Sequence, residues 1–461
     1  MATLLIRDID WVLTVDHERR MIRHGAIAIT DDRISYVGTS AGLNATFNAD
    51  KTMDGRGLVA LPGLVDASVA SVLQLGRGAG DGCDMPRYRL ERSLACEGAL
   101  NGVDALAAAR ACQLEMIHSG TTSFADSGSR FTAEVGAAAV ESGLRALVSR
   151  SCADVYDTFI GAFPESFARE STTDAIANAT AALQARSHDR VQCAIALPWL
   201  AACSDVLLRD AAALARGHGA RIIIGAGCAR DDAVASRREH GRTEIARLAA
   251  AGLLGPHTIV SHAGWISPAD MRSLADSGAS VACCPSASHR QGTGALEYGR
   301  YPELAAFGVN VALGSGSAMA GNHADIARQL FLYCGSNMSL RLDATIASPE
   351  SALEMATING ARALGLEADI GSLEAGKKAD IAFFNASAPD WVPLINPVGN
   401  LAFSSRGGAH TVIADGTVLM RDGRVQTLDE DRVLAEAQAR AAALMQRSGL
   451  DRFCHPAWPV E

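Results

Sequence analysis

The sequence predicts an α/β protein in which a (β/α)8 TIM-like barrel is joined to a small β-sandwich domain. In the middle of the chain, short β-branched runs alternate with helical patterns of ten or more residues. About eight such units are typical of a closed parallel barrel. Short β-type runs flank this middle on both sides, which indicates one further domain built from two distant segments. The 461 residues also exceed the roughly 250 that a barrel alone takes.

Residues 1–60 are expected to form the first part of the β-sandwich. The runs LLIRDIDWVLTV, GAIAITDDRISYVG and KTMDGRGLVALPG are separated by Asp, Gly and charged residues that favour turns. The first run carries Arg7, Asp8 and Asp10 among its apolar residues and has no cationic lead-in, so it is interpreted as a strand and not as a signal peptide. We therefore expect a cytoplasmic protein.

The barrel is expected over residues 61–365. Strand TTSFAD precedes helix FTAEVGAAAVESG, strand QCAIALPW precedes helix DVLLRDAAALARGHG, and strand HTIVSHAG precedes helix PADMRSLADSG. In such barrels the functional residues lie at the carboxyl ends of the strands. Because side chains two apart on an extended chain point the same way, the strand end LPGLVDASVA would turn Ser68 and Ala70 toward one site.

The second part of the β-sandwich is expected over residues 366–428, and a helix and tail over residues 429–461. The runs ADIAFFN and AHTVIADGTVLM predict strands, and the Asp-Gly pairs at 415–416 and 422–423 predict hairpin turns. The segment DEDRVLAEAQARAAALMQRSG has apolar residues at helical spacing. We expect this helix to pack on the barrel or on a neighbouring subunit.

Composition excludes several classes of partner. Hydrophobic residues make up 48% of the chain, yet no apolar run reaches the roughly 18 residues that span a bilayer. The formal charge of -10 and the lack of a Lys- and Arg-rich run argue against nucleic acid. Eleven cysteines without a CxxC pair indicate reduced thiols and not a disulfide framework.

Several motifs resemble one known family over nearly the full length. LPGLVDA, HSGTTSFAD, GPHTIVSHAGWIS, NVALGSGS and GSLEAGKKADIAFFN resemble the amidohydrolase superfamily, in the branch of the triazine hydrolases and S-adenosylhomocysteine deaminases. The resemblance implies hydrolysis of non-peptide C–N bonds at a mononuclear zinc or iron. In that family the ligands are His-x-His after the first strand, a His after the fifth, a His after the sixth and an Asp after the eighth. A Glu after the fifth strand moves protons, and a His after the seventh strand contacts the substrate.

This chain departs from that ligand set. Four of the five ligand positions carry no imidazole or carboxylate: Ser68, Ala70, Gly225 and Gly316. His262 is the retained ligand, while Cys228 and Cys283 replace the proton-moving Glu and the substrate-contacting His. Serine and glycine offer zinc nothing comparable to imidazole or carboxylate. The sequence therefore predicts that the metal site is lost, and neither a metal nor another cofactor is expected.

Two functional interpretations stay open, so whether the chain is an enzyme also stays open. The first is a catalytically silent homologue that binds a small molecule, or that acts as a subunit of a homo-oligomer or beside an active homologue. Its ligand would contact the four vacated positions, with Ser286 and His289 at the rim.

The second interpretation is a hydrolase with a rebuilt site. His262, Cys228 and Cys283 follow neighbouring strands, and a Cys beside a His can become a thiolate nucleophile or bind a soft metal. The simpler alternative is that both Cys are small buried hydrophobes and His262 is a hydrogen-bonded polar residue.

Overall fold

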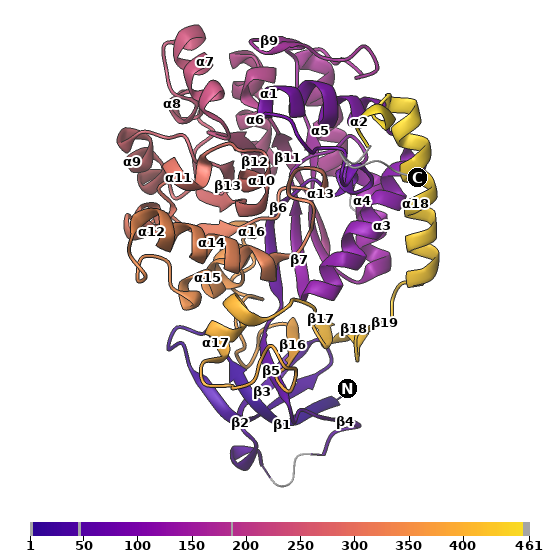
Figure 1. Cartoon of the computed structure of the whole chain (residues 1–461), viewed down its shortest axis with the longest axis vertical. Coiled ribbons are helices and arrows are strands. Elements are labelled where there is room, and N and C mark those ends of the chain that lie inside the picture. The colour runs from indigo at the N-terminus through magenta and orange to yellow at the C-terminus, as the bar shows by residue number, and fades with distance from the viewer. Residues whose placement is uncertain (1–2, 45–47, 186–187, 455–461) are drawn as a thin grey trace.

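The computed structural model describes residues 3–44, 48–185 and 188–454. An α/β barrel lies above a β domain, and the last helix, α18 (Glu430–Ser448), runs along one side of the barrel (Figure 1). The β domain is formed by segments from both ends of the sequence, as the repeated β-type runs predicted. Residues 455–461 of the expected tail lie outside the described residues.

The predicted barrel is confirmed. Within the described residues, one sheet holds eight strands that pair in parallel and in sequence order. These strands are β6 (Leu64–Val69), β7 (Thr121–Asp126), β8 (Arg145–Ser151), β11 (Val191–Leu197), β12 (Ile222–Ala226), β13 (Thr258–His262), β14 (Ser280–Cys283) and β15 (Val311–Leu313). A parallel bridge between Val69 and Gly316 joins the first strand to the segment after the last, which closes the ring at its carboxyl edge.

Helices cover the outside of the barrel, and shorter helices lie at its mouth. The longer ones are α3 (Gly102–Ser119), α4 (Thr132–Ser142), α5 (Thr172–Gln184), α6 (Asp205–His218), α7 (Arg230–His240), α8 (Glu244–Ala250), α9 (Pro268–Ser277), α14 (Ile326–Arg341), α15 (Pro349–Met355) and α16 (Ile358–Leu364). The short ones include α10 (Pro285–Arg290), α11 (Ala295–Tyr298), α12 (Tyr301–Ala306) and α13 (Ala318–Gly321). Capping boxes at Asn101 and Ser267 begin α3 and α9, because each side chain accepts a hydrogen bond from the first helical turn.

The β domain is a single mixed sheet. Its strands are β1 (Thr3–Leu13), β2 (Met21–Thr30), β3 (Arg33–Thr39), β4 (Lys51–Asp54), β5 (Leu58–Pro62), β16 (Ile381–Asn385), β17 (Thr411–Ala414), β18 (Thr417–Arg421) and β19 (Arg424–Val425). Strand β5 links the two halves, since it pairs with β1 in parallel and with β16 antiparallel. The Asp-Gly turns at 415–416 and 422–423 have positive φ at both residues, as two-residue hairpin turns require.

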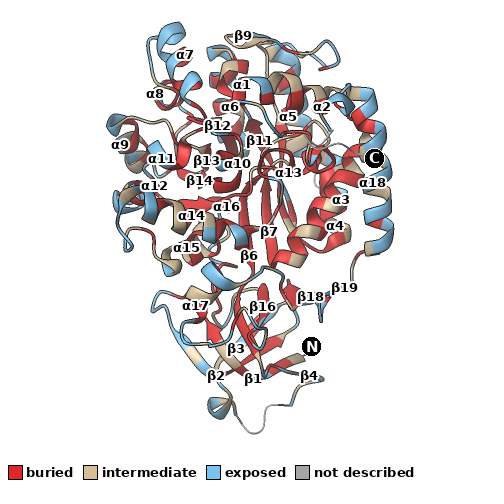
Figure 2. Cartoon of the chain, viewed as in Figure 1, coloured by how far each residue is buried: buried red, intermediate tan, exposed pale blue. Residues whose placement is uncertain are grey.

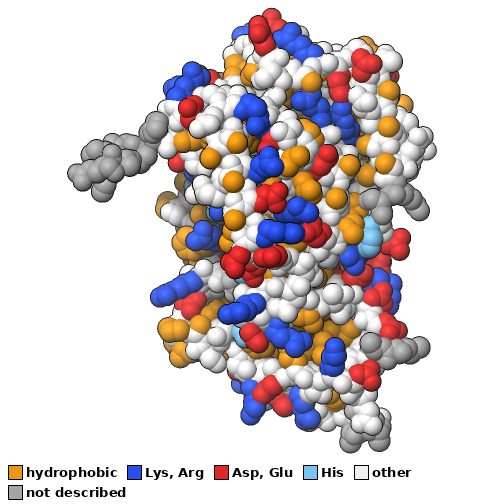
Figure 3. Space-filling model, turned by 90° about the vertical axis from the view of Figure 1, so that its right-hand side faces the viewer, with side chains coloured by type: hydrophobic (Ala, Val, Ile, Leu, Met, Phe, Trp, Pro, Cys, Tyr) orange, Lys and Arg blue, Asp and Glu red, His pale blue; other side chains and the backbone are white. Residues whose placement is uncertain are grey.

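Helix α18 packs on the barrel, which is one of the two placements expected for it. Val433, Leu444 and Met445 are buried, and the carboxylate of Glu430 lies 3.0 Å from the imidazole of His118 on α3. Figure 2 shows that the outer face of α18 is exposed, whereas the barrel strands and the inner faces of the helices are buried. On the side of the molecule that Figure 3 shows, positive and negative side chains are interspersed. In the described part of the chain, no helix is both long and apolar enough to cross a bilayer.

Candidate functional site

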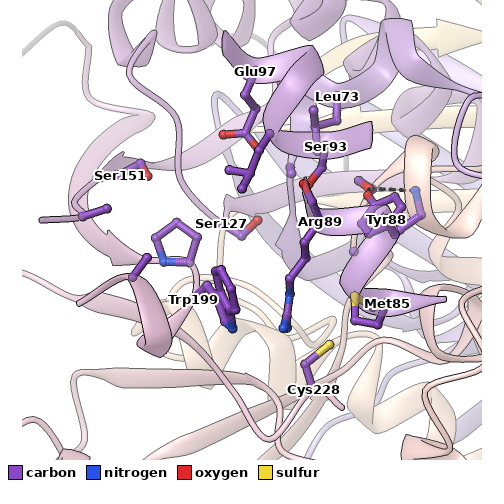
Figure 4. Close-up of a pocket in the computed structure, with 18 of the residues that line it drawn as sticks. Leu73, Met85, Tyr88, Arg89, Ser93, Glu97, Ser127, Ser151, Trp199 and Cys228 are labelled. Atoms are coloured by element: carbon purple, nitrogen blue, oxygen red, sulfur yellow. Dashed lines mark hydrogen bonds between the residues drawn. The ribbon is translucent and has the colours of Figure 1, made fainter. Parts of the chain in front are cut away.

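A cavity of about 180 Å³ lies at the carboxyl ends of the barrel strands. It is covered by the segment that follows β6, which contains η2 (Ser71–Gly76), α1 (Met85–Arg87), η3 (Tyr88–Ser93) and α2 (Leu94–Ala99). We call η2 to α2, residues 71–99, the cover segment. Large apolar and aromatic side chains form most of the wall: Met85, Tyr88, Leu94, Phe163, Phe167 and Trp199. Figure 4 shows part of this lining.

Hydrogen bonds join the residues at the ligand positions on β6 and after β15 to each other and to β13. The hydroxyl of Ser68 lies 2.8 Å from the hydroxyl of Ser261 at the end of β13, and both side chains are buried. The N–H of Gly316 donates to the carbonyl of Ser68 at 2.9 Å, and the N–H of Ala70 donates to the carbonyl of Gly316 at 2.7 Å. Ala70 and Gly316 line the cavity.

The backbone around Gly225 and Gly316 leaves little room for a ligand side chain. A Cβ at Gly225 would lie 2.1 Å from the carbonyl oxygen of Pro198, and backbone cannot give way as a flexible side chain can. Gly316 has φ +76°, where an aspartate would be strained, and a Cβ there would lie 3.0 Å from the Cβ of Ala287. Restoring the family's His and Asp would therefore require the strand ends to move.

The donor set does not fit a zinc or iron ion. Such an ion takes three or more protein ligands in enzymes of this kind. Across residues 3–44, 48–185 and 188–454, no group of three or more His, Cys, Asp or Glu side chains is arranged to hold a metal ion. Of the five ligand positions that the resemblance implies, only His262 offers a donor.

His262 ends β13 with a left-handed backbone, φ +74°. Its carbonyl accepts a hydrogen bond from the hydroxyl of Tyr301 at 2.7 Å. Its imidazole lines the cavity and makes no hydrogen bond to any residue that the structure describes. Burial, together with the nearby Arg89 guanidinium, lowers the pKa of His262 to about 4, so the ring is neutral at physiological pH.

The two cysteines of the rebuilt-site hypothesis have different places. Cys228 lines the cavity beside His262, whereas Cys283 is fully buried in the barrel core near Tyr301. Burial raises the pKa of Cys228 to about 12, although the Arg89 guanidinium beside it opposes the rise. Burial also raises the pKa of Cys283. Both groups are therefore neutral thiols at pH 7, which disfavours a thiolate nucleophile.

The structure places Ser286 and His289 away from the cavity, although the sequence suggested that they form its rim. Both lie on α10, which turns Ala287 toward the cavity. Ser286 exchanges hydrogen bonds with the side chain of Gln329 on α14, at 3.0 and 2.9 Å. His289 is exposed and its Nε2 lies 2.7 Å from the hydroxyl of Ser336.

Sequence reasoning missed a buried ion pair that fastens the cover segment to the barrel. The Arg89 guanidinium forms two parallel bonds to the Asp232 carboxylate at the start of α7, at 2.5 and 2.9 Å. The indole N–H of Trp199 donates to the same carboxylate at 2.9 Å, and the guanidinium lies 4.6 Å from the centre of the indole ring. Figure 4 shows Arg89 reaching past Trp199 toward Cys228. Arg89 and Asp232 stand 143 positions apart, and no motif in the sequence marks them as a pair.

Glu97, on α2, was also missed. Its carboxylate lines the cavity and accepts no hydrogen bond from the described residues. Burial raises the pKa of Glu97 to about 7, opposed by Arg130 and assisted by Asp126. In Figure 4, Glu97 lies at the opposite end of the labelled group from Cys228. The cavity therefore has a carboxyl group at one end and a neutral imidazole and thiol at the other.

Comparisons with known proteins agree with this architecture. Residues 59–437 match the family described as Amidohydrolase family. A 5-methylthioadenosine/S-adenosylhomocysteine deaminase from Moorella thermoacetica is 32% identical over 95% of this chain and 99% of its own length. A 5'-deoxyadenosine deaminase from Methanothermobacter thermautotrophicus is 32% identical over 92% of this chain and 95% of its own length.

Two solved structures are similar in fold. One is an adenosine deaminase from Xanthomonas campestris with bound zinc, with a TM-score of 0.89 and 23% identity over 96% of this chain and 99% of that one. The other is a triazine hydrolase from Arthobacter aurescens, with a TM-score of 0.88 and 22% identity over 96% of this chain and 100% of that one.

Proposed function

This chain belongs to the amidohydrolase family, and on that basis we propose that it binds a small nitrogen-containing ligand at the barrel mouth without the family's metal-assisted hydrolysis. The observation that carries the proposal is the replacement of four ligand positions by Ser68, Ala70, Gly225 and Gly316. The contact that a side chain at Gly225 would make with the Pro198 carbonyl supports it, because the site cannot regain this ligand without backbone movement. A cavity with mostly apolar walls and a few polar groups is typical of a binding site.

Metal content and turnover, measured together, test the proposal. The purified protein, as isolated and after incubation with zinc, is analysed for bound metal and then given 5'-deoxyadenosine, the compound for which a relative is named. We expect much less than one equivalent of tightly bound zinc or iron and no release of ammonia, while calorimetry detects binding of the nucleoside. One equivalent of metal, together with turnover that His262→Ala abolishes, would overturn the proposal.

A hydrolase with a rebuilt site is the second candidate. It is favoured by the shared position of His262 and Cys228 in one cavity and by relatives named as deaminases. The neutral state of the Cys228 thiol argues against it. This candidate requires turnover that Cys228→Ala abolishes while the fold is retained. Inhibition by a chelator would distinguish a soft-metal site from a metal-free one.

The oligomeric state of the protein stays a prediction. A homo-oligomer, or a complex with a catalytically active member of the family, would give a catalytically inactive chain a role beyond ligand binding. Purification from the native source, followed by mass spectrometry of the intact complex, distinguishes the two forms of assembly.

A further inference from the structure

Helix α14 has an outer face without charge. Residues 329–340 contain no Asp, Glu, Lys or Arg, although charged residues make up 20% of the chain. The outward side chains recur at the spacing that places them on one face of a helix. They are half-buried or exposed, and we call them the α14 stripe: Phe331, Leu332, Gly335, Met338 and Leu342. Phe331 is 52% exposed and Leu342 is 95% exposed.

A neighbouring segment extends the α14 stripe. Phe403, on η5 (Asn400–Ser404), is also exposed, and its ring packs edge-to-face against Phe331 with the ring centres 6.4 Å apart. Helix α18, on another side of the barrel, is different because it exposes Asp431, Arg432 and Arg447 (Figure 1). A helix that faces only water normally carries such charges. The outer face of α14 is therefore suited to contact with another molecule.

Gly335 lies in the middle of the α14 stripe, and no contact within the chain requires it. A Cβ at Gly335 would meet none of the described atoms within 4 Å. Glycine inside a helix lowers helix stability relative to alanine, so such a position needs a separate reason. Close approach of another backbone is one, because only glycine leaves room for it. Gly335 thus indicates where a second molecule would cross α14.

The two ends of the α14 stripe carry opposite charges. Arg328 lies in the first turn of α14 with its side chain exposed, and the exposed Asp343 directly follows Leu342. Gly335 stands midway between these two residues in the sequence. If two copies of α14 cross antiparallel at Gly335, Arg328 of each copy lies opposite Asp343 of the other. Opposite charges placed in this way orient an association, so the stripe is complementary to itself.

A lipid surface fits the α14 stripe less well than a second copy of the chain. Helices that lie on membranes carry several Lys or Arg residues beside their apolar face, and residues 329–340 have none. The formal charge of -10 also opposes binding to anionic lipids.

We propose that two copies of this chain associate through the α14 stripe, with their α14 helices antiparallel and crossing at Gly335. The same patch then serves both copies, as in a twofold-symmetric dimer. Phe331 and Phe403 are the aromatic anchors of the interface, since aromatic side chains dominate the binding energy of such contacts. No residue of α14 lines the cavity at the barrel mouth. The inference is therefore independent of the proposed ligand binding, and it specifies the surface of the expected homo-oligomer.

Sedimentation velocity across the micromolar concentration range tests the interface on wild type, Phe331→Glu and Leu434→Glu. Leu434 is a matched control, because it is 56% exposed but lies on α18. Circular dichroism establishes that each variant is folded. We expect wild type to dimerise, Phe331→Glu to raise the dissociation constant at least about tenfold, and Leu434→Glu to behave as wild type. Gly335→Ala should also weaken the dimer, even though alanine favours the helix within each chain.

Charge reversal tests the antiparallel arrangement. Arg328→Glu and Asp343→Lys each place like charges opposite one another in a homodimer, so each variant alone should associate more weakly than wild type. An equimolar mixture of the two should recover association, because both pairs in the mixed dimer then have opposite signs.

Four results would overturn the inference: a wild-type monomer throughout the concentration range, an undiminished dimer in folded Phe331→Glu, an undiminished dimer in Gly335→Ala, or no recovery in the mixture. A monomer that binds 5'-deoxyadenosine without turnover would contradict only this inference. A dimer of the expected kind that shows metal-dependent turnover would contradict only the proposed function.

Discussion

The two sides of the barrel mouth are packed in different ways. Beneath the cavity, the vacated positions are closed by small groups, through the Ser68–Ser261 hydroxyl pair and the approach of Pro198 to Gly225. Beside it, a large buried ion pair between Arg89 and Asp232 joins the cover segment to the barrel. One side consists of small uncharged groups, while the other holds a buried charged network. The barrel mouth is therefore closely packed on both sides, and the cavity lies between them.

The largest expected effect comes from breaking the ion pair. Asp232→Ala leaves the Arg89 guanidinium buried without a partner, and the loss of one member of a buried pair typically costs about 3–5 kcal/mol of unfolding free energy. Chemical denaturation measures this loss. The neighbouring Asp231 is exposed, so Asp231→Ala should change stability by no more than about 0.5 kcal/mol. Equal effects of the two substitutions would show that the pair does not hold the cover segment.

Reintroducing a ligand on the other side should also destabilise the fold. In Gly225→His, the Cβ meets the Pro198 carbonyl, and overpacking of this kind costs about 1–3 kcal/mol. We expect no gain in zinc affinity, since one more imidazole beside His262 still leaves the other positions without donors. Gly217→Ala is the control, because a Cβ at Gly217 meets no atom within 4 Å. A stable Gly225→His protein that binds one equivalent of zinc would contradict the proposed function.

An effect of similar size is expected from the hydroxyl pair of Ser68 and Ser261. Ser68→Ala or Ser261→Ala leaves one buried hydroxyl without its partner, which costs about 1–3 kcal/mol. The double variant should recover part of this loss, because removing both partners of a buried bond is nearly neutral. Denaturation of the four proteins of this double-mutant cycle gives the coupling energy. Additive losses would mean that the two hydroxyls do not depend on each other.

The fold could be predicted from the sequence because its signals are local and periodic. Alternating strand and helix patterns predicted the barrel, and the Asp-Gly pairs predicted the hairpins of β17 to β19. The assignment of Gly225 to a ligand position also follows from motif spacing, which places each motif at a strand end. These features depend on residues that are close together in the sequence.

The rest of the site depends on packing between distant segments. Arg89 and Asp232 are 143 residues apart, and nothing in their spacing selects this pair among many Arg and Asp side chains. The orientation of α10, which turns Ser286 toward Gln329 and away from the cavity, is likewise set by tertiary contacts. The raised pKa of Glu97 follows from burial, which a sequence does not give.

The last expected effect is a pH dependence of stability that arises from the buried carboxyl group of Glu97. The pKa of Glu97 is raised in the folded protein to about 7, above its ordinary value of 4.5. A group of this kind binds more protons when folded than when unfolded between these two values, so its contribution to stability is complete below pH 4.5 and is lost as the pH rises through 7. Asp66, with a pKa raised to about 7, and Glu244, with a pKa raised to about 8, act in the same direction.

Glu97→Gln cannot titrate, so its unfolding free energy should fall less steeply than that of wild type between pH 5 and about 7.5, whereas Glu91→Gln should follow wild type. Glu91 is a suitable control, since it lies on the same cover segment and pairs with Arg87 outside the cavity. Urea unfolding at several pH values measures the two slopes. Parallel curves for wild type and Glu97→Gln would place Glu97 in ordinary solvent.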